Sequence, residues 1–127
     1  MATRLKKNIK HLILVRHGQS TYNLENRFTG WKDVNLTNKG INEAKKAVDL
    51  LDGVPISRAF TSSLKRAQNT LEIILNGLNI DPEITKNEKL NERDYGSLIG
   101  QNKAEAAEKF GSEQVQIWRR SYSTPPP

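Results

Sequence analysis

The nine residues LILVRHGQS, at positions 12–20, restrict the possible folds more than any other part of the chain. Four apolar residues followed by an Arg-His-Gly turn predict a strand over 12–16 that is covered on both faces, as in a parallel sheet. Gly18 allows the backbone to turn sharply and to approach a ligand closely. Because open α/β sheets bind ligands beyond the carboxyl ends of their strands, Arg16 and His17 are candidate site residues.

The rest of the chain alternates between helical and extended patterns. Strand, helix and strand joined by short connections predict a parallel sheet with right-handed crossovers. We therefore expect an α/β fold of three layers, with a mostly parallel sheet, helices on both faces, and an incomplete core. We expect a basic, weakly ordered tail over 1–10 and one domain over 11–127. Within the domain, after the strand at 12–16, the expected elements are a polar connection over 17–36, a helix over 38–51 capped by Thr37, a strand over 58–61, a helix capped by Ser62 or Ser63 and ended by Gly77, a strand at 84–85, a helix over 102–110, and a shorter helix that ends at about 120.

Composition excludes several classes of protein. The chain has 127 residues and no cysteine, which excludes disulfides and thiolate metal sites. Its apolar runs are too short to span a bilayer, so a cytoplasmic protein is expected. The net charge of +6 includes a basic start, which is either a solvated tail or an arm for nucleic acid. An aromatic content of 6% argues against nucleic acid, and an apolar content of 35% is low for a sheet covered on both faces.

Two groups of polar residues follow neighbouring strands. Arg16 and His17 follow the first strand, and the segment 62–66 follows the second, so both should meet in one crevice. Lys65 and Arg66 stand in the first turn of a helix, where the helix dipole disfavours cations. They are either solvated side chains or ligands of an anion bound at that helix end.

His17 is either a structural histidine or a nucleophile. Arg16 beside it offers a permanently charged fork that suits phosphate, which favours phosphoryl transfer to an imidazole nitrogen. A metal site is not expected, because the only other histidine, His11, is six residues away and about 20 Å distant in an extended segment. Glu92 is either a solvated loop acid or a general acid and base, and Arg119 with Arg120 form either an anion clamp or a cationic helix end.

Several motifs resemble the cofactor-dependent phosphoglycerate mutases of the histidine phosphatase superfamily. Arg-His-Gly at 16–18 is similar to the signature of the whole superfamily. The segments that resemble the mutases themselves are NRFTGW at 26–31, TSSLKRA at 61–67, LNERDYG at 90–96, GQNKAE at 100–105 and WRR at 118–120. The resemblance covers residues 11 to 127.

The resemblance implies a role for each matching residue. His17 would be the phosphohistidine and Glu92 the proton donor and acceptor, with Arg16 and Arg66 as the further catalytic residues. The residues that would bind substrate are Arg16, Asn23, Thr29, Gly30, Arg66, Glu92, Tyr95, Lys103, Arg119 and Arg120. The reaction would interconvert 3-phosphoglycerate and 2-phosphoglycerate in glycolysis and gluconeogenesis, primed by 2,3-bisphosphoglycerate, without metal, in a homo-oligomer such as a dimer.

The family pattern continues beyond what this sequence contains. Members carry a second catalytic histidine and more of the sheet in about a hundred further residues, so the resemblance implies a C-terminally truncated chain. Because that histidine stabilises the transition state, we expect weak or no mutase activity from these 127 residues. The alternatives are a non-catalytic phosphate-binding remnant and a histidine phosphatase.

Overall fold

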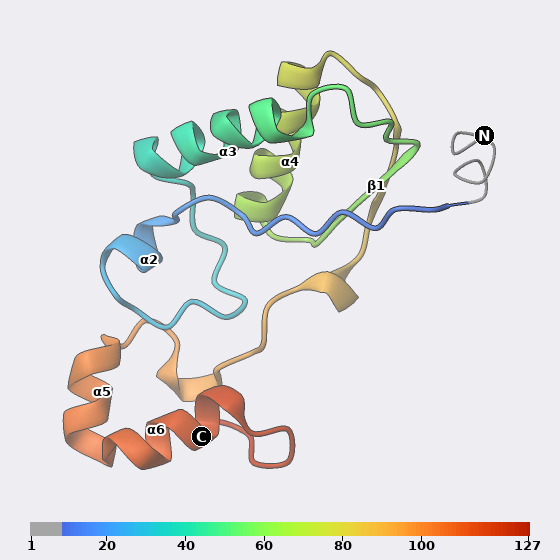
Figure 1. Cartoon of the computed structure of the whole chain (residues 1–127). Coiled ribbons are helices and arrows are strands. Elements are labelled where there is room, and N and C mark those ends of the chain that lie inside the picture. Colours follow the sequence, from blue (N-terminus) through green and yellow to red (C-terminus); the bar gives the residue numbers. More distant parts are fainter. Residues whose placement is uncertain (1–8) are drawn as a thin grey trace.

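A computed structural model describes residues 9–127 as a series of short helices around one pair of strands (Figure 1). The predicted basic tail at 1–10 lies mostly outside the described residues. The elements in chain order are α2 (Thr21–Leu24), α3 (Asn38–Leu51), β1 (Arg58–Thr61), α4 (Lys65–Leu78), β2 (Glu83–Lys86), the 3₁₀ helices η2 (Glu88–Leu90) and η3 (Gly96–Leu98), α5 (Lys103–Phe110) and α6 (Ser112–Arg120).

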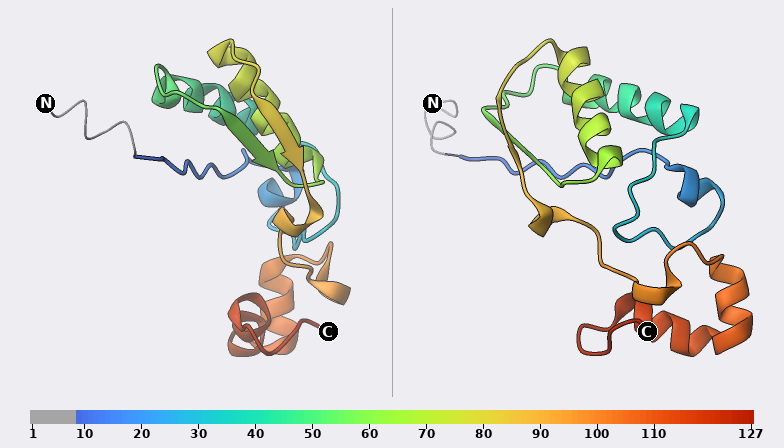
Figure 2. Two further views of the ribbon diagram at one scale, coloured as in Figure 1. Left: turned by 90° about the vertical axis from the view of Figure 1, so that its right-hand side faces the viewer. Right: turned by 180° about the vertical axis from the view of Figure 1, so that it is seen from behind.

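The two strands form a parallel pair, as the sequence predicts. Arg58 lies opposite Glu83 and Thr61 opposite Lys86, and α4 makes the crossover between the strands. Helix α4 also contacts β1, and α3 packs on α4. Helices α5 and α6 lie at the other end of the molecule, away from the sheet (Figures 1 and 2). The α/β class is confirmed, whereas residues 9–127 form two strands of the sheet and not the complete three-layer arrangement.

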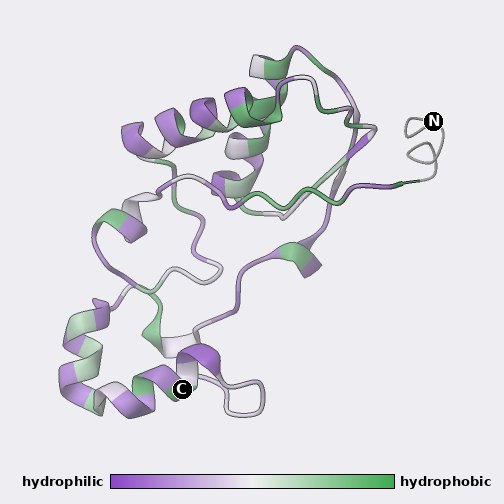
Figure 3. Ribbon diagram, viewed as in Figure 1, coloured by the Kyte–Doolittle hydropathy of each residue, from purple (hydrophilic) through white to green (hydrophobic). Residues whose placement is uncertain are grey.

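The predicted buried strand at 12–16 is wrong for the described residues. This segment runs as an extended chain without strand pairing, and Leu12 and Leu14 are 83% and 85% exposed. Figure 3 shows it as a hydrophobic stretch that no other ribbon covers. A strand requires a neighbour that accepts and donates its backbone hydrogen bonds, and no described segment pairs with this one. The apolar composition of residues 12–16 is therefore not sufficient to make them a strand.

The longer helices lie where the sequence predicts them, but only some of the predicted caps are observed. Thr37 caps α3 as predicted, because its side chain accepts a hydrogen bond from the Gly40 amide at 3.1 Å. The caps predicted for α4 are wrong. The N-cap residue is Leu64, whose own side chain makes no capping hydrogen bond. The helix runs through Gly77 and ends at Asn79 in a left-handed conformation (φ 54°).

The polar connection at 17–36 contains a short helix that the sequence analysis missed. Helix α2 begins with a capping box, in which Ser20 accepts from the amide of Asn23 and Asn23 accepts from the amide of Ser20. A helix of four residues is too short to produce a recognisable hydrophobic period.

A small apolar cluster joins this connection to the C-terminal helices. It consists of Phe28, Leu98, Ala106 and Val115, all nearly or fully buried, with Tyr95, Phe110 and Trp118 packed against it. The cluster places α5 and α6 beside the end of the connection, which carries the cationic residues of those helices toward Arg16 and His17. Among the helices of the described residues, none has the length and apolar character needed to cross a bilayer.

Candidate functional site

His17 occupies the turn after the extended segment and is half-buried. Its Nδ1 atom lies 2.6 Å from the carbonyl oxygen of Gly18. Because a carbonyl only accepts, this contact places a proton on Nδ1 and leaves Nε2 as the basic, nucleophilic nitrogen. Partial burial lowers the pKa of His17 below its ordinary value of 6.5, and the nearby charge of Arg66 also lowers it. The imidazole is therefore neutral at pH 7, as a nucleophile must be.

Contacts with α3 and α4 fix the backbone around His17. The Gly18 amide donates to the hydroxyl of Thr70 at 3.1 Å, and this hydroxyl donates to the Arg66 carbonyl in α4 at 2.8 Å. Gly18 also lies directly against Gly40 of α3, where a Cβ atom would be 2.7 Å from the Gly40 carbonyl carbon. The two glycines thus allow two backbones to touch at the site.

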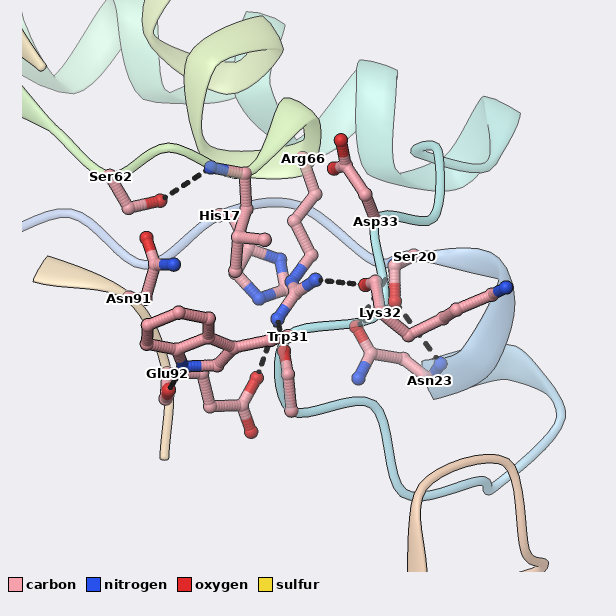
Figure 4. A network of polar contacts seen from close by, with 12 residues as sticks. His17, Ser20, Asn23, Trp31, Lys32, Asp33, Ser62, Arg66, Asn91 and Glu92 are labelled. Atoms are coloured by element: carbon pink, nitrogen blue, oxygen red, sulfur yellow. Dashed lines mark hydrogen bonds and ion pairs between the residues drawn. The ribbon is translucent and has the colours of Figure 1, made fainter. Parts of the chain in front are cut away.

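Arg66 is the most deeply buried charged residue of the site, with 1% of its surface exposed. Its guanidinium donates to the carbonyls of Lys32 at 2.9 Å and Gly30 at 2.7 Å, and to the carboxylate of Glu92 at 2.9 Å (Figure 4). Three of its five N–H groups are used in this way. Arg66 therefore holds two loops in place as well as supplying positive charge near His17.

The start of α4, where the sequence left an anion site open, has a side-chain acceptor from the protein itself. The amide of Lys65 donates to the carboxylate of Asp33 at 2.7 Å, so a side chain of the protein already occupies this helix end. Arg66 turns away from the helix axis toward the carbonyls of 30 and 32. Asp33 and Glu92 thus supply negative charge beside the cations of this first turn.

Glu92 is brought close to His17 from a segment 75 positions along the chain. Its side chain is 40% exposed, while that of its partner Arg66 is 1% exposed. The negative charge of Glu92 raises the pKa of His17, which opposes the effects of burial and of the arginines. The carboxylate is thus anchored on one side and open to solvent on the other, as a group that exchanges protons with a ligand requires.

The remaining predicted cations gather around the same place. Burial lowers the pKa of Lys103 below its ordinary value of 10.5, and the charge of Arg119 lowers it further. Arg16 and Arg120 contribute in the same direction, whereas Glu92 raises it. Four cations from three segments therefore repel one another at one site, and a bound polyanion would relieve this repulsion.

The other predicted substrate residues lie on the surrounding loops. Asn23 uses its side-chain oxygen to accept from Ser20, which leaves its NH₂ group to donate. Thr29 and Gly30 are buried, and Tyr95 packs against Phe28 with ring centroids 5.1 Å apart. The geometry thus gives Asn23 a free donor beside His17, while Thr29, Gly30 and Tyr95 shape the loop that joins the cluster.

A hollow of about 420 Å³ lies beside Arg16, His17 and Asn23. Lys39 and Glu43 from the first turns of α3 also line it, and the sequence analysis did not single out either residue. It also missed Trp31, whose indole N–H donates to the Glu92 carbonyl at 2.7 Å. No local pattern predicted their contacts at this site, although Trp31 belongs to the NRFTGW motif, because these contacts arise only through the packing of α3 and the 30–33 turn.

The profile of the histidine phosphatase superfamily (branch 1) matches residues 12–127. The chain belongs to this superfamily.

Several relatives of this superfamily member are much longer than it is. It is 56% identical over 119 residues to a 2,3-bisphosphoglycerate-dependent phosphoglycerate mutase of Methylocella silvestris, with 91% of this chain and 58% of the relative covered. It is 54% identical over 121 residues to the protein of that name from Porphyromonas gingivalis, with 93% and 49% covered. The chain therefore spans about half the length of the curated relatives it matches.

Solved structures support the fold of the histidine phosphatase chain. A mycobacterial glucosyl-3-phosphoglycerate phosphatase superposes with a TM-score of 0.75 at 24% identity, with 87% of this chain and 51% of that one covered. The phosphoglycerate mutase of Bacillus anthracis superposes with a TM-score of 0.69 at 22% identity, with 80% and 47% covered. Both confirm the predicted fold class.

The lowered pKa of His17 predicts how the stability of this superfamily member depends on pH. Between the lowered native pKa and 6.5, the unfolded chain binds more protons than the native chain. The free energy of unfolding should therefore rise with pH through this window, and His17 should contribute no further change above it. Urea unfolding at pH values on both sides of 6.5 measures this slope, which His17→Gln should reduce. An equal reduction in the control His11→Gln would contradict the assignment.

Proposed function

We propose that this chain carries the phosphate acceptor and the acid–base carboxylate of a 2,3-bisphosphoglycerate-dependent phosphoglycerate mutase, which interconverts 3-phosphoglycerate and 2-phosphoglycerate. The observation that carries the proposal is the imidazole of His17, with Nδ1–H on the Gly18 carbonyl and the arginines and Glu92 around it. The names of the relatives at 56% and 54% identity supply the substrate class.

The donor set fits a small polyanion. Four cations repel one another at the site, and two of them, Lys103 and Arg119, are half-buried. This arrangement suits a ligand that carries phosphate and carboxylate groups, and the other two cations are Arg16 and Arg120. We assign the binding of these groups to the four cations together with Asn23, Thr29, Gly30 and Tyr95. When bound there, 2,3-bisphosphoglycerate would supply the phosphoryl group that primes the enzyme.

Each residue near His17 has a distinct task in this proposal. Nε2 of His17 attacks phosphorus while the Gly18 carbonyl holds Nδ1–H and stabilises the developing positive charge. Arg16 and Arg66 supply positive charge beside the transferring phosphoryl group. Glu92 carries the proton to and from the substrate oxygen, which its partial exposure permits.

Labelling with phosphorus-32 tests the first half of this reaction. Incubation with labelled 2,3-bisphosphoglycerate should give a protein-bound label that is stable to alkali and labile to acid, as a phosphoramidate is. The chain has two histidines, so His17→Gln should abolish the label and His11→Gln should retain it. Label that survives His17→Gln would refute the role of His17.

The fate of the label distinguishes the mutase from a phosphatase. Transfer of the label to added 3-phosphoglycerate supports the mutase. Release of the label as inorganic phosphate supports hydrolysis of the phosphohistidine by water that enters beside the exposed part of Glu92.

We further propose a cytoplasmic homo-oligomer, such as a dimer. The exposed apolar side chains of Leu12, Leu14 and Phe60 support such an association.

A further inference from the structure

Glu92 and the residue before it are held at three points by residues from other segments. Its main-chain carbonyl accepts from the indole N–H of Trp31 at 2.7 Å, and its carboxylate accepts from Arg66 at 2.9 Å. The preceding residue, Asn91, accepts through its side-chain oxygen from the amide and hydroxyl of Ser63, both at 2.9 Å. Figure 4 shows the indole lying across the Glu92 backbone. The main chain and the side chain of Glu92 therefore have separate anchors.

The turn that carries Trp31 is itself rigidly placed. The carbonyls on either side of Trp31, those of Gly30 and Lys32, both accept from the buried guanidinium of Arg66. The next residue, Asp33, caps α4 through its carboxylate. The indole thus extends from a turn that is fixed to the same helix as the guanidinium that binds the Glu92 carboxylate.

Trp31 is not held in this position by burial. Its side chain is 47% exposed, although tryptophan is a large apolar residue that proteins usually bury further. The indole is half-exposed and makes one directed hydrogen bond, so its position is better explained by the hydrogen bond of its N–H than by the packing of its ring.

We propose that Trp31 is a positioning residue, whose indole N–H fixes the Glu92 main chain so that the carboxylate stays on the Arg66 guanidinium, near His17. The inference rests on the proposed function, in which Glu92 carries the substrate proton. An acid–base group has to be held to within about half an ångström of its working position. The Arg66 contact anchors the side chain and the Ser63 contacts anchor the preceding residue, Asn91, while the Trp31 contact adds an anchor on the Glu92 main chain itself.

Titration of His17 tests this inference without any need for turnover. We expect Glu92→Gln to lower the pKa of His17, because the carboxylate raises it. Trp31→Phe keeps an aromatic ring and removes the N–H, so it should lower the pKa of His17 by about half as much. Proton NMR resolves the two histidines of the chain, and His11 serves as the internal reference.

The control is the same substitution at the second tryptophan. Trp118 packs edge-on against Phe110, with ring centroids 5.2 Å apart, and Trp118→Phe should leave the pKa of His17 unchanged. Arg16 and Arg66, which lower this pKa, are present in every variant. A wild-type pKa in Trp31→Phe, a wild-type pKa in Glu92→Gln, or an equal shift in Trp118→Phe would each overturn the inference.

Labelling provides a second readout that a merely structural role would not change in the same way. In the first transfer a P–N bond forms at Nε2 of His17, the P–O bond to the substrate oxygen breaks, and the proton for that oxygen passes through the Glu92 carboxyl. Trp31→Phe should slow this labelling about tenfold while the Kd for 3-phosphoglycerate stays unchanged. A weakened Kd with an unchanged rate would overturn the inference. Absence of label in the wild type would reject the proposed function, and the titration would still decide the role of Trp31.

Discussion

Replacement of Arg66 by methionine is expected to lower the free energy of unfolding by about 3 kcal/mol. The guanidinium is 1% exposed and pairs with two carbonyls and one carboxylate, all of which lose their partner in Arg66→Met. The Glu92 side chain is 40% exposed, so water replaces part of the lost interaction, and the effect lies at the lower end for a broken buried pair. Urea unfolding monitored by circular dichroism measures the change.

A second arginine of the chain provides the control for this substitution. Arg58 pairs with Glu83 across the two strands at 3.2 Å, with side chains 61% and 69% exposed. Arg58→Met should change the free energy of unfolding by less than about 1 kcal/mol, because exposed ion pairs contribute little. Equal changes in the free energy of unfolding for Arg66→Met and Arg58→Met would show that the burial of Arg66 does not increase its contribution to stability.

Substitution of Gly18 by alanine is expected to disrupt the site and to cost about 3 kcal/mol of stability. The added Cβ would fall on the carbonyl of Gly40 and lie 2.7 Å from its carbon, and both atoms belong to the backbone of α3. Since neither backbone can move aside as a side chain would, α3 and the His17 turn must separate. Urea unfolding measures the cost, and labelling of His17 with phosphorus-32 measures the loss of function.

Gly53→Ala separates this steric effect from that of backbone conformation. Gly53 has a φ of 76° and no atom within 4 Å of its would-be Cβ, so alanine there meets conformational strain alone. The expected cost is about 1 kcal/mol. A cost for Gly18→Ala no larger than that for Gly53→Ala would mean that the contact between Gly18 and Gly40 is easily relaxed.

Much of the local structure could be predicted from the sequence because its causes are local. The apolar period of 38–51 and the hydroxyl of Thr37 are enough to place α3 and its start. The segment 12–16 was wrongly predicted as a strand, because a strand depends on a partner elsewhere in the chain and no described segment pairs with this one. The end of α4 at Asn79 rather than Gly77 likewise depends on packing, since Gly77 lies against Val48 of α3.

The sequence was most informative about the residues of the site that follow predicted strands or belong to a motif. His17 and Glu92 were expected to lie at one site, and the structure places both near Arg66, while their reactivity stays a prediction. The sequence suggested that Arg66 meets an anion at a helix end, but the structure shows it bound to two carbonyls and a carboxylate of its own chain. The contact of Trp31 was not predicted, because the sequence around an indole N–H in a turn does not indicate an acceptor 61 positions away.

Helix α4 has a consequence for the dynamics of the site. It holds Gly18 through Thr70, it holds the 30–32 turn and Glu92 through Arg66, and it accepts Asp33 as its cap. These segments therefore share one cooperative unit of opening, and none of them is released while the helix stays intact. The slowest-exchanging amide protons of α4 would then report how long the assembled site survives before it opens.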